Sequence, residues 1–150
     1  MNPEQVHITL KFLGDVPESS IADIGDAISG INCDPFTAKI RGIGAFPKPS
    51  YPRVIHIGAY PEDYFNRLHV EVESALKLLG FTNEKRAFTP HATVARVKRI
   101  SKEQRIKLVD TIKRLSDLEI GTMDVTMIKL KKSTLTPEGA IYETLKEAYL

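Results

Sequence analysis

Short stretches in which apolar and polar residues alternate mark the strands that we expect in this chain. A period of two puts every second side chain on one face, as in a strand that is buried on one side. Such stretches cover residues 6–13, 36–43, 53–58 and 89–97, and a β-rich region from 118 to 130 precedes a last strand at 141–145. The proline-rich residues 44–52 predict an irregular loop, and Thr136 to Gly139 predicts the turn of a hairpin.

Apolar residues spaced by three or four positions predict three helices. The first follows Pro17, ends near Gly30 and has isoleucines along one side. The second runs from Pro61 to Gly80. The third begins with a capping box at Ser101 and is expected to bury Ile106, Val109, Ile112 and Leu115. Because strands joined directly by a loop pair antiparallel, this order of elements predicts the α+β class.

Two of the expected strands contain the pattern His-x-Thr. It occurs at His7 and Thr9 and returns at His91 and Thr93. Residues two apart on a strand share a face, so each strand presents an imidazole and a hydroxyl together. Histidine exchanges protons near neutral pH, and two imidazoles on opposite sides of a phosphate suit an in-line displacement, one as base and one as acid. We expect the fold to bring the two pairs together.

The flanks of both motifs resemble the signature motifs of the two-histidine phosphoesterases. The first reads HITLKFLG over residues 7–14, and the second reads FTPHATVAR over residues 88–96. Within that superfamily the chain is most similar to the RNA 2',3'-cyclic phosphodiesterases, first named 2'-5' RNA ligases. The resemblance covers essentially the whole chain and continues through the closing LTPEGAIY at residues 135–142.

This resemblance implies one phosphoesterase domain over residues 1–150, built from two lobes. Each lobe would be a small antiparallel sheet with helices outside, and the active-site cleft would lie between the lobes. The family has a strand and a helix before its first motif, whereas His7 comes almost at once here. The family is monomeric, but a lobe without these elements exposes a sheet edge, so we expect either a dimer or a weakened lobe.

The resemblance also implies roles for the motif residues. His91 would activate water as the base, and His7 would protonate the departing 3' oxygen of a 2',3'-cyclic phosphate, which leaves a 2'-phosphate. The near-symmetry of the motifs leaves the exchanged assignment open. Thr9 and Thr93 are expected to donate hydrogen bonds to phosphate oxygens. No metal or other cofactor is required.

Four residues near the motifs are candidates for substrate binding. Lys11 would share the strand face of His7 and Thr9 and contact the phosphate, with a solvated lysine as the alternative. Strict alternation turns Arg96 away from His91 unless the strand has a twist or bulge. Phe46 and Phe88 are candidates for stacking on a nucleobase, with core packing as the alternative. His56 is interpreted as a packing or surface residue, with base stacking as the alternative, and His69 as a structural residue.

Composition limits the class of protein and of partner. The chain has 150 residues, a net charge of +2 and a single cysteine, Cys33, so we expect one ordinary cytoplasmic domain without an internal disulfide or a membrane span. A charge of +2 alone does not indicate nucleic acid. The expected partner, RNA with 2',3'-cyclic phosphate ends such as tRNA fragments or other single-stranded 3' ends, would meet local basic residues: Lys39, Arg41, Lys48, Arg53, Lys85 and Arg86.

Two other functions remain open at this point. A 5'-hydroxyl in place of water would make the same site a 2'-5' RNA ligase. A distorted site would leave an idle RNA-binding protein. A metal hydrolase is disfavoured because no cysteine or paired carboxylate joins the motif histidines, and a serine hydrolase because no Gly-x-Ser-x-Gly occurs.

Overall fold

A computed structural model describes residues 2–150 of the chain. Its strands and helices follow one another in nearly the order that the sequence predicted. The α+β class and the antiparallel pairing are confirmed. The chain forms two compact units. Unit 1 contains the residues up to Thr9, Thr37–Glu62 and Thr89–Met123, and unit 2 contains Leu10–Phe36, Asp63–Phe88 and Asp124–Leu150. The cleft expected between two lobes stays a prediction.

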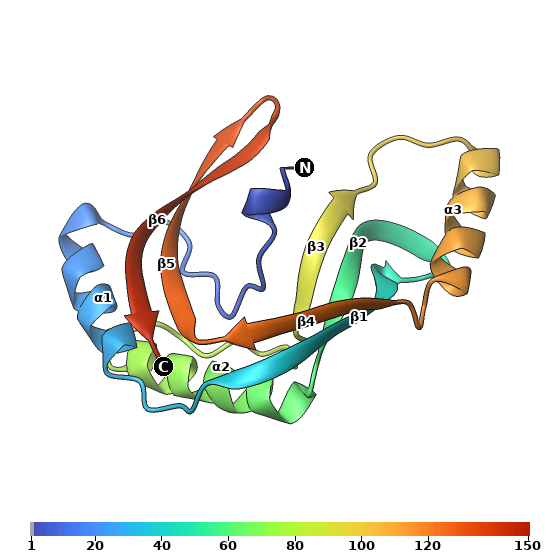
Figure 1. The fold of residues 1–150 in the computed structure, drawn as a ribbon. Helices are drawn as coiled ribbons and strands as arrows, with labels where there is room; N and C mark the ends of the chain where they lie inside the picture. Colours follow the sequence, from blue (N-terminus) through green and yellow to red (C-terminus); the bar gives the residue numbers. More distant parts are fainter. Residues whose placement is uncertain (1) are drawn as a thin grey trace. The chain divides into compact units, whose positions relative to one another are not determined.

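Unit 1 is built on a four-stranded sheet in the order β3-β2-β1-β4 (Figure 1). Its strands are β1 (Phe36–Lys48), β2 (Tyr51–Tyr60), β3 (His91–Arg96) and β4 (Glu119–Val125). β1 pairs with β2, and β2 with β3, in the antiparallel sense. Helix α3 (Lys102–Arg114) completes the unit, and the capping box predicted at its start is present.

One face of this sheet is apolar. Ile43 pairs with Ile57 and Ala45 with Ile55, so these side chains share a face. The end of α3 is joined to β1 by two backbone bonds, from Gly42 N to Leu118 O at 2.8 Å and from Ile43 N to Leu115 O at 3.0 Å. The opposite face is therefore the one left for polar side chains.

Unit 2 combines a two-stranded sheet with two helices. Its elements are α1 (Ile21–Ser29), α2 (Glu62–Lys77), β5 (Met127–Thr136) and β6 (Gly139–Tyr149), with a 3-10 turn at Glu18–Ser20 (η2). The 3-10 turn at Pro3–Gln5 (η1) belongs to unit 1. The predicted stripes meet in its core. Its buried apolar residues are Ile24, Ile28, Ile31, Phe65, Leu68, Val72, Leu76, Val125, Ile128 and Ala148. No helix among residues 2–150 is long and apolar enough to cross a membrane.

The strand expected over residues 6–13 does not form, so that prediction was wrong. Ile8 makes one isolated antiparallel bridge with Ala92. Before it lies η1, and after it the carbonyl of Leu10 accepts a hydrogen bond from His69 Nδ1 at 2.9 Å. This contact joins the segment after the bridge to α2.

The loop expected over residues 44–52 was also wrong. β1 continues to Lys48 and β2 begins at Tyr51, so the connection is a turn at residues 49–50. Pro47 lies opposite Pro52, next to a register shift. The ladder is already interrupted there, so the missing N–H groups cost little.

The inward side of α3 differs from the predicted stripe. Ile112 is buried, but Ile106 is 61% exposed. Leu108, Val109 and Leu115 are half-buried. The spacing of the apolar residues identified the buried Ile112 but did not show how far the others are buried.

The capping box of α3 gives a direct test of this part of the fold. Ser101 Oγ accepts from Gln104 N at 3.1 Å, and Gln104 Oε1 accepts from Ser101 N at 2.8 Å. Ser101→Ala is expected to lower the free energy of unfolding by about 1 kcal/mol in urea titration, whereas Ser101→Asp keeps an accepting oxygen and stays close to wild type. Equal stability of all three proteins would contradict this role.

Candidate active site

The polar face of the unit 1 sheet carries the second motif. On β3, His91 pairs with Gly58, Thr93 with His56, and Arg96 with Val54. The three partners are two residues apart on β2 and share a face, so His91, Thr93 and Arg96 share it as well. The register shift beside His56 gives β3 one extra residue and reverses the alternation. From the sequence, Arg96 could share the face of His91 only if the strand had a twist or bulge, and this bulge is present.

The bridge between Ile8 and Ala92 brings the first motif to the same sheet edge. Paired residues share a face, so their neighbours are directed to the opposite, polar face. One step on either side of the bridge, His7 comes opposite Thr93 and Thr9 comes opposite His91. The two histidines are diagonal neighbours, a relation in which Cα atoms lie roughly 7–8 Å apart.

Both motif histidines are held in the same way. His7 Nδ1 lies 2.7 Å from the carbonyl oxygen of Gln5, and His91 Nδ1 lies 2.6 Å from that of Thr89. A carbonyl oxygen only accepts hydrogen bonds, so Nδ1 carries the proton in each ring. Proton exchange with a substrate is thereby assigned to Nε2 in both residues.

Two aromatic rings, Phe46 and His56, pack against the second motif. His91 is 4.9 Å from Phe46 and 5.3 Å from His56, measured between ring centroids. Phe46 and His56 are 4.3 Å apart. His91 is therefore flanked by two rings on the side of β1 and β2, which limits its rotation.

Comparison with known proteins identifies the family. The family model described as LigT like phosphoesterase matches residues 1–56 and 57–142. The chain belongs to this family. It is 41% identical to the RNA 2',3'-cyclic phosphodiesterase of Aeropyrum pernix over 96% of this chain and 81% of that protein. It is 42% identical to the protein of the same name from Archaeoglobus fulgidus, over 97% and 80% of the two chains.

A solved structure from Thermus thermophilus has the same fold. It superposes with a TM-score of 0.78 at 31% identity and covers 100% of this chain and 80% of that one. Its family makes the protein an enzyme of the phosphoesterase class, as the two motifs predicted.

Two substrate-binding candidates of the phosphoesterase, Lys11 and Phe88, make their contacts within unit 2. The expectation that Lys11 shares a strand face with His7 and Thr9 was wrong, because no strand continues past Ile8. Lys11 Nζ instead forms a buried ion pair with Glu73 at 2.6 Å. Phe88 stacks on His69 at 4.4 Å with an interplanar angle of 6°. Both residues belong to unit 2.

The sequence did not identify His56 as a neighbour of the catalytic candidates. It predicted packing, which is confirmed by the contact with Phe46, but not the contact with His91. Burial first, and the nearby His91 second, lower the pKa of His56 below its ordinary value. Its Nδ1 is buried without a hydrogen-bond partner among the described residues. The position of His56 depends on Gly44, where a Cβ would lie 2.6 Å from the imidazole Cε1.

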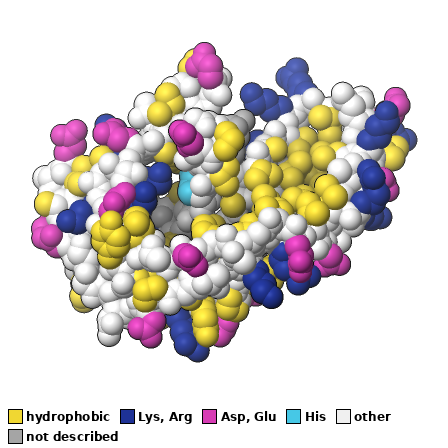
Figure 2. Space-filling model, in the orientation of Figure 1, with side chains coloured by type: hydrophobic (Ala, Val, Ile, Leu, Met, Phe, Trp, Pro, Cys, Tyr) yellow, Lys and Arg dark blue, Asp and Glu magenta, His cyan; other side chains and the backbone are white. Residues whose placement is uncertain are grey.

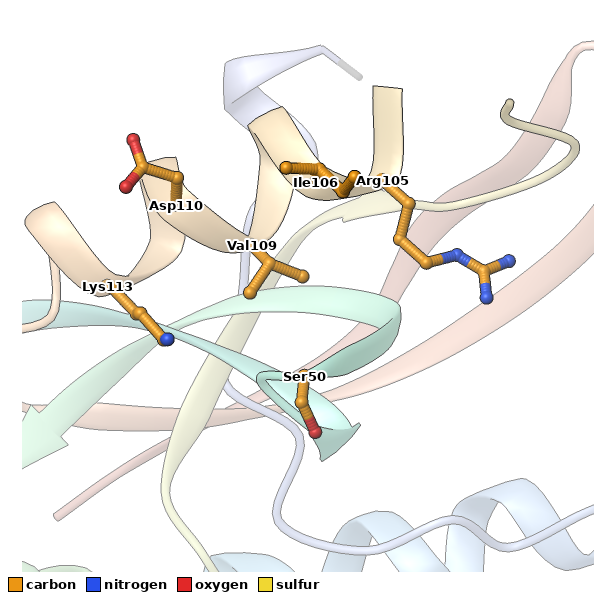
Figure 3. A pocket seen from close by; sticks show the side chains of 6 residues that line it. All are labelled: Ser50, Arg105, Ile106, Val109, Asp110 and Lys113. Atoms are coloured by element: carbon orange, nitrogen blue, oxygen red, sulfur yellow. The ribbon is translucent and has the colours of Figure 1, made fainter. Parts of the chain in front are cut away.

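Unit 1 has a hollow apart from the motif residues. A hollow of about 360 Å³ between α3 and the β1–β2 turn is lined by Ser50, Arg105, Ile106, Val109, Asp110 and Lys113 and contains no motif residue (Figure 3).

Positive and negative side chains are interspersed on the face drawn in Figure 2. No three His, Cys, Asp or Glu side chains in residues 2–150 come together as a metal site would require. Burial first, then Asp34 and Glu71, raise the pKa of the Cys33 thiol, which fits a packing residue.

The close approach of Gly44 to His56 predicts a defect from one methyl group. In Gly44→Ala the new Cβ would clash with the His56 ring, which must shift and so disturb its contacts with Phe46 and His91. We expect phosphodiester hydrolysis to slow on the order of tenfold or more, measured as kcat. Gly121→Ala is the matched control, because a Cβ there meets nothing within 4 Å. Equal kcat for both variants would contradict the contact's importance.

The lowered pKa of His56 predicts how stability depends on pH. Its folded pKa lies below the unfolded one, so the unfolded state binds more protons, and stability falls as the pH drops below about 6.5. His56→Phe is expected to flatten this fall, seen as a smaller change in Tm between pH 7.5 and pH 5.5. The variant also removes the unpartnered Nδ1, so its stability at pH 7.5 should not be lower. An identical pH dependence in both proteins would refute the assignment.

Proposed function

We propose that this phosphoesterase hydrolyses the 2',3'-cyclic phosphate at RNA ends to a 2'-phosphate, without a metal, by paired-histidine catalysis. The observation that carries the proposal is the matched hydrogen bonding of His7 and His91, each donating Nδ1–H to the carbonyl two residues before it. The substrate class is supported by the Aeropyrum and Archaeoglobus relatives, which are named RNA 2',3'-cyclic phosphodiesterases.

The matched hydrogen bonds give each imidazole both states that the reaction needs. With Nδ1 protonated, a neutral ring has a lone pair at Nε2 and acts as a base. A charged ring has a proton at Nε2 and acts as an acid. One neutral and one charged histidine on the same sheet face therefore supply a base and an acid together.

The reaction is a displacement at phosphorus. His91 removes a proton from water through Nε2, and the water oxygen forms a bond to phosphorus. The bond from phosphorus to the 3' oxygen breaks, and His7 gives that oxygen its Nε2 proton. The products are a 2'-phosphate and a 3'-hydroxyl. The antiparallel bridge relates the motifs by a local two-fold axis, so the exchanged roles use the same geometry.

The remaining polar groups on this face serve the phosphate and the nucleotide. The hydroxyls of Thr9 and Thr93 donate to the non-bridging oxygens, where charge builds up in the transition state. Arg96 is exposed on the same face and provides a bidentate donor for a phosphate. Phe46 offers a ring beside His91 for the nucleobase of a single-stranded 3' end.

Removing either motif histidine tests the proposal. His7→Ala and His91→Ala are each expected to lower kcat about 10²–10⁴-fold on an oligonucleotide with a 2',3'-cyclic phosphate, because each loses one proton transfer. Product analysis should show a 2'-phosphate, and EDTA should leave the wild-type rate unchanged. Adding an RNA with a 5'-hydroxyl shows whether a hydroxyl replaces water. Retention of the wild-type rate by either variant would refute paired-histidine catalysis.

A further inference from the structure

One turn of α2 contacts the chain just after the first histidine motif and just before the second. His69 and Glu73 are four residues apart on this helix and project from the same side. His69 contacts Leu10 and Phe88, and Glu73 contacts Lys11 and Glu84. We call His69 and Glu73 the α2 clamp.

The contacts of Glu73 form a small buried network. Lys11 Nζ donates to Glu73 Oε1 at 2.6 Å and to the carbonyl of Thr82 at 2.8 Å. Glu73 Oε2 accepts from the backbone N–H of Glu84 at 3.2 Å. The side chains of Lys11 and Glu73 are only 4% and 8% exposed. The segment after the first motif and the segment before the second are therefore fastened to one carboxylate.

His69 makes the corresponding contacts closer to the motifs. Its Nδ1–H donates to the carbonyl of Leu10, the residue directly after Thr9. Its ring lies parallel to that of Phe88, the residue directly before Thr89. Thr89 in turn provides the carbonyl that holds His91 Nδ1. A shift of either contact reaches a motif residue through a very short stretch of backbone.

The sheet holds the first motif through a single bridge. Ile8 and Ala92 form an isolated bridge, and the strand expected around His7 is absent. A buried ion pair is also weak evidence for stabilisation, because apolar residues of similar size often replace such pairs without loss. The buried Lys11–Glu73 pair lies beside a motif that the sheet holds by one bridge. We therefore explain the pair by the position that it gives the backbone after Thr9.

We propose that the α2 clamp positions the two His-x-Thr motifs relative to each other for phosphoryl transfer. This rests on the proposed function. His69, Glu73 and Lys11 are positioning residues, since they act through the backbone next to His7 and His91. Displacing a reacting group by about 1 Å can cost as much as 100-fold in rate, so a small relaxation of the clamp is visible in kcat.

The test replaces the ion pair by apolar side chains of similar length. Lys11→Met with Glu73→Met is expected to keep the Tm within a few degrees of wild type, lower kcat roughly tenfold to 100-fold and change KM little. The control is Asp63→Asn with Arg67→Met, which removes an exposed ion pair from the same helix. Its kcat should equal that of wild type. An unchanged kcat in the Lys11/Glu73 variant would overturn the proposal.

Two variants of His69 separate the contacts and serve also if the double variant does not fold. His69→Asn keeps a donor for the Leu10 carbonyl but loses the ring on Phe88, and His69→Phe keeps a ring but loses the donor. Each is expected to lower kcat severalfold. His69→Ala, which loses both contacts, should lower kcat more than either. Wild-type kcat in all three would contradict the clamp.

A spectroscopic measurement distinguishes failure of the clamp from failure of the proposed function. Long-range ¹H–¹⁵N spectra of His7 and His91 should show Nδ1-protonated rings in wild type and in the Asp63/Arg67 control. The Lys11/Glu73 variant should shift or broaden these signals. If wild type does not cleave cyclic phosphates but the signals still respond, the clamp stands and the proposed function fails. If wild type is active and the signals are unchanged, the clamp fails.

Discussion

The backbone bridge between Ile8 and Ala92 is the constraint on which the rest of the candidate site depends. It sets His7 opposite Thr93 and Thr9 opposite His91, and it directs all four side chains to the face that also carries Arg96. An antiparallel pair has a local two-fold axis, and a displacement at phosphorus has an entering and a leaving oxygen on opposite sides. The symmetry of the backbone pairing therefore matches the symmetry that the proposed chemistry needs.

The two sides of the bridge are held by different kinds of contact. On the β3 side, His91 is packed by Phe46 and by His56, which fits only because residue 44 is glycine. The buried, unpartnered Nδ1 of His56 is a local cost of about 1–3 kcal/mol, and such costs are characteristic of functional sites. On the side of the first motif, regular pairing is absent and contacts with α2 take its place.

The sequence predicted most of the fold because its local signals agreed with the tertiary packing. The isoleucines of α1, the stripe of α2, the capping box at Ser101 and the hairpin turn after Thr136 are all present. The errors came from interactions between distant segments. Alternation predicted a strand through Lys11, but His69 and Glu73 draw that segment to α2. Prolines predicted a loop at 44–52, but their pairing across a register shift lets the hairpin continue.

For the candidate site, the sequence predicted residues whose roles stay predictions. The repeated His-x-Thr pattern gave the residues, and the flanks gave the family, which the comparison confirmed. The need for a bulge at Arg96 was also foreseen. The neighbour His56 was missed because its contact with His91 requires the register of three strands, which one sequence without its partners does not specify.

The most direct measurement of the central claim is a crystal structure with a nucleoside 2',3'-vanadate, which imitates the five-coordinate transition state. We expect the Nε2 atoms of His7 and His91 to lie about 2.6–3.2 Å from the two opposite apical oxygens. A complex in which only one of the two imidazoles reaches an apical oxygen, or in which both reach the same one, would contradict the account.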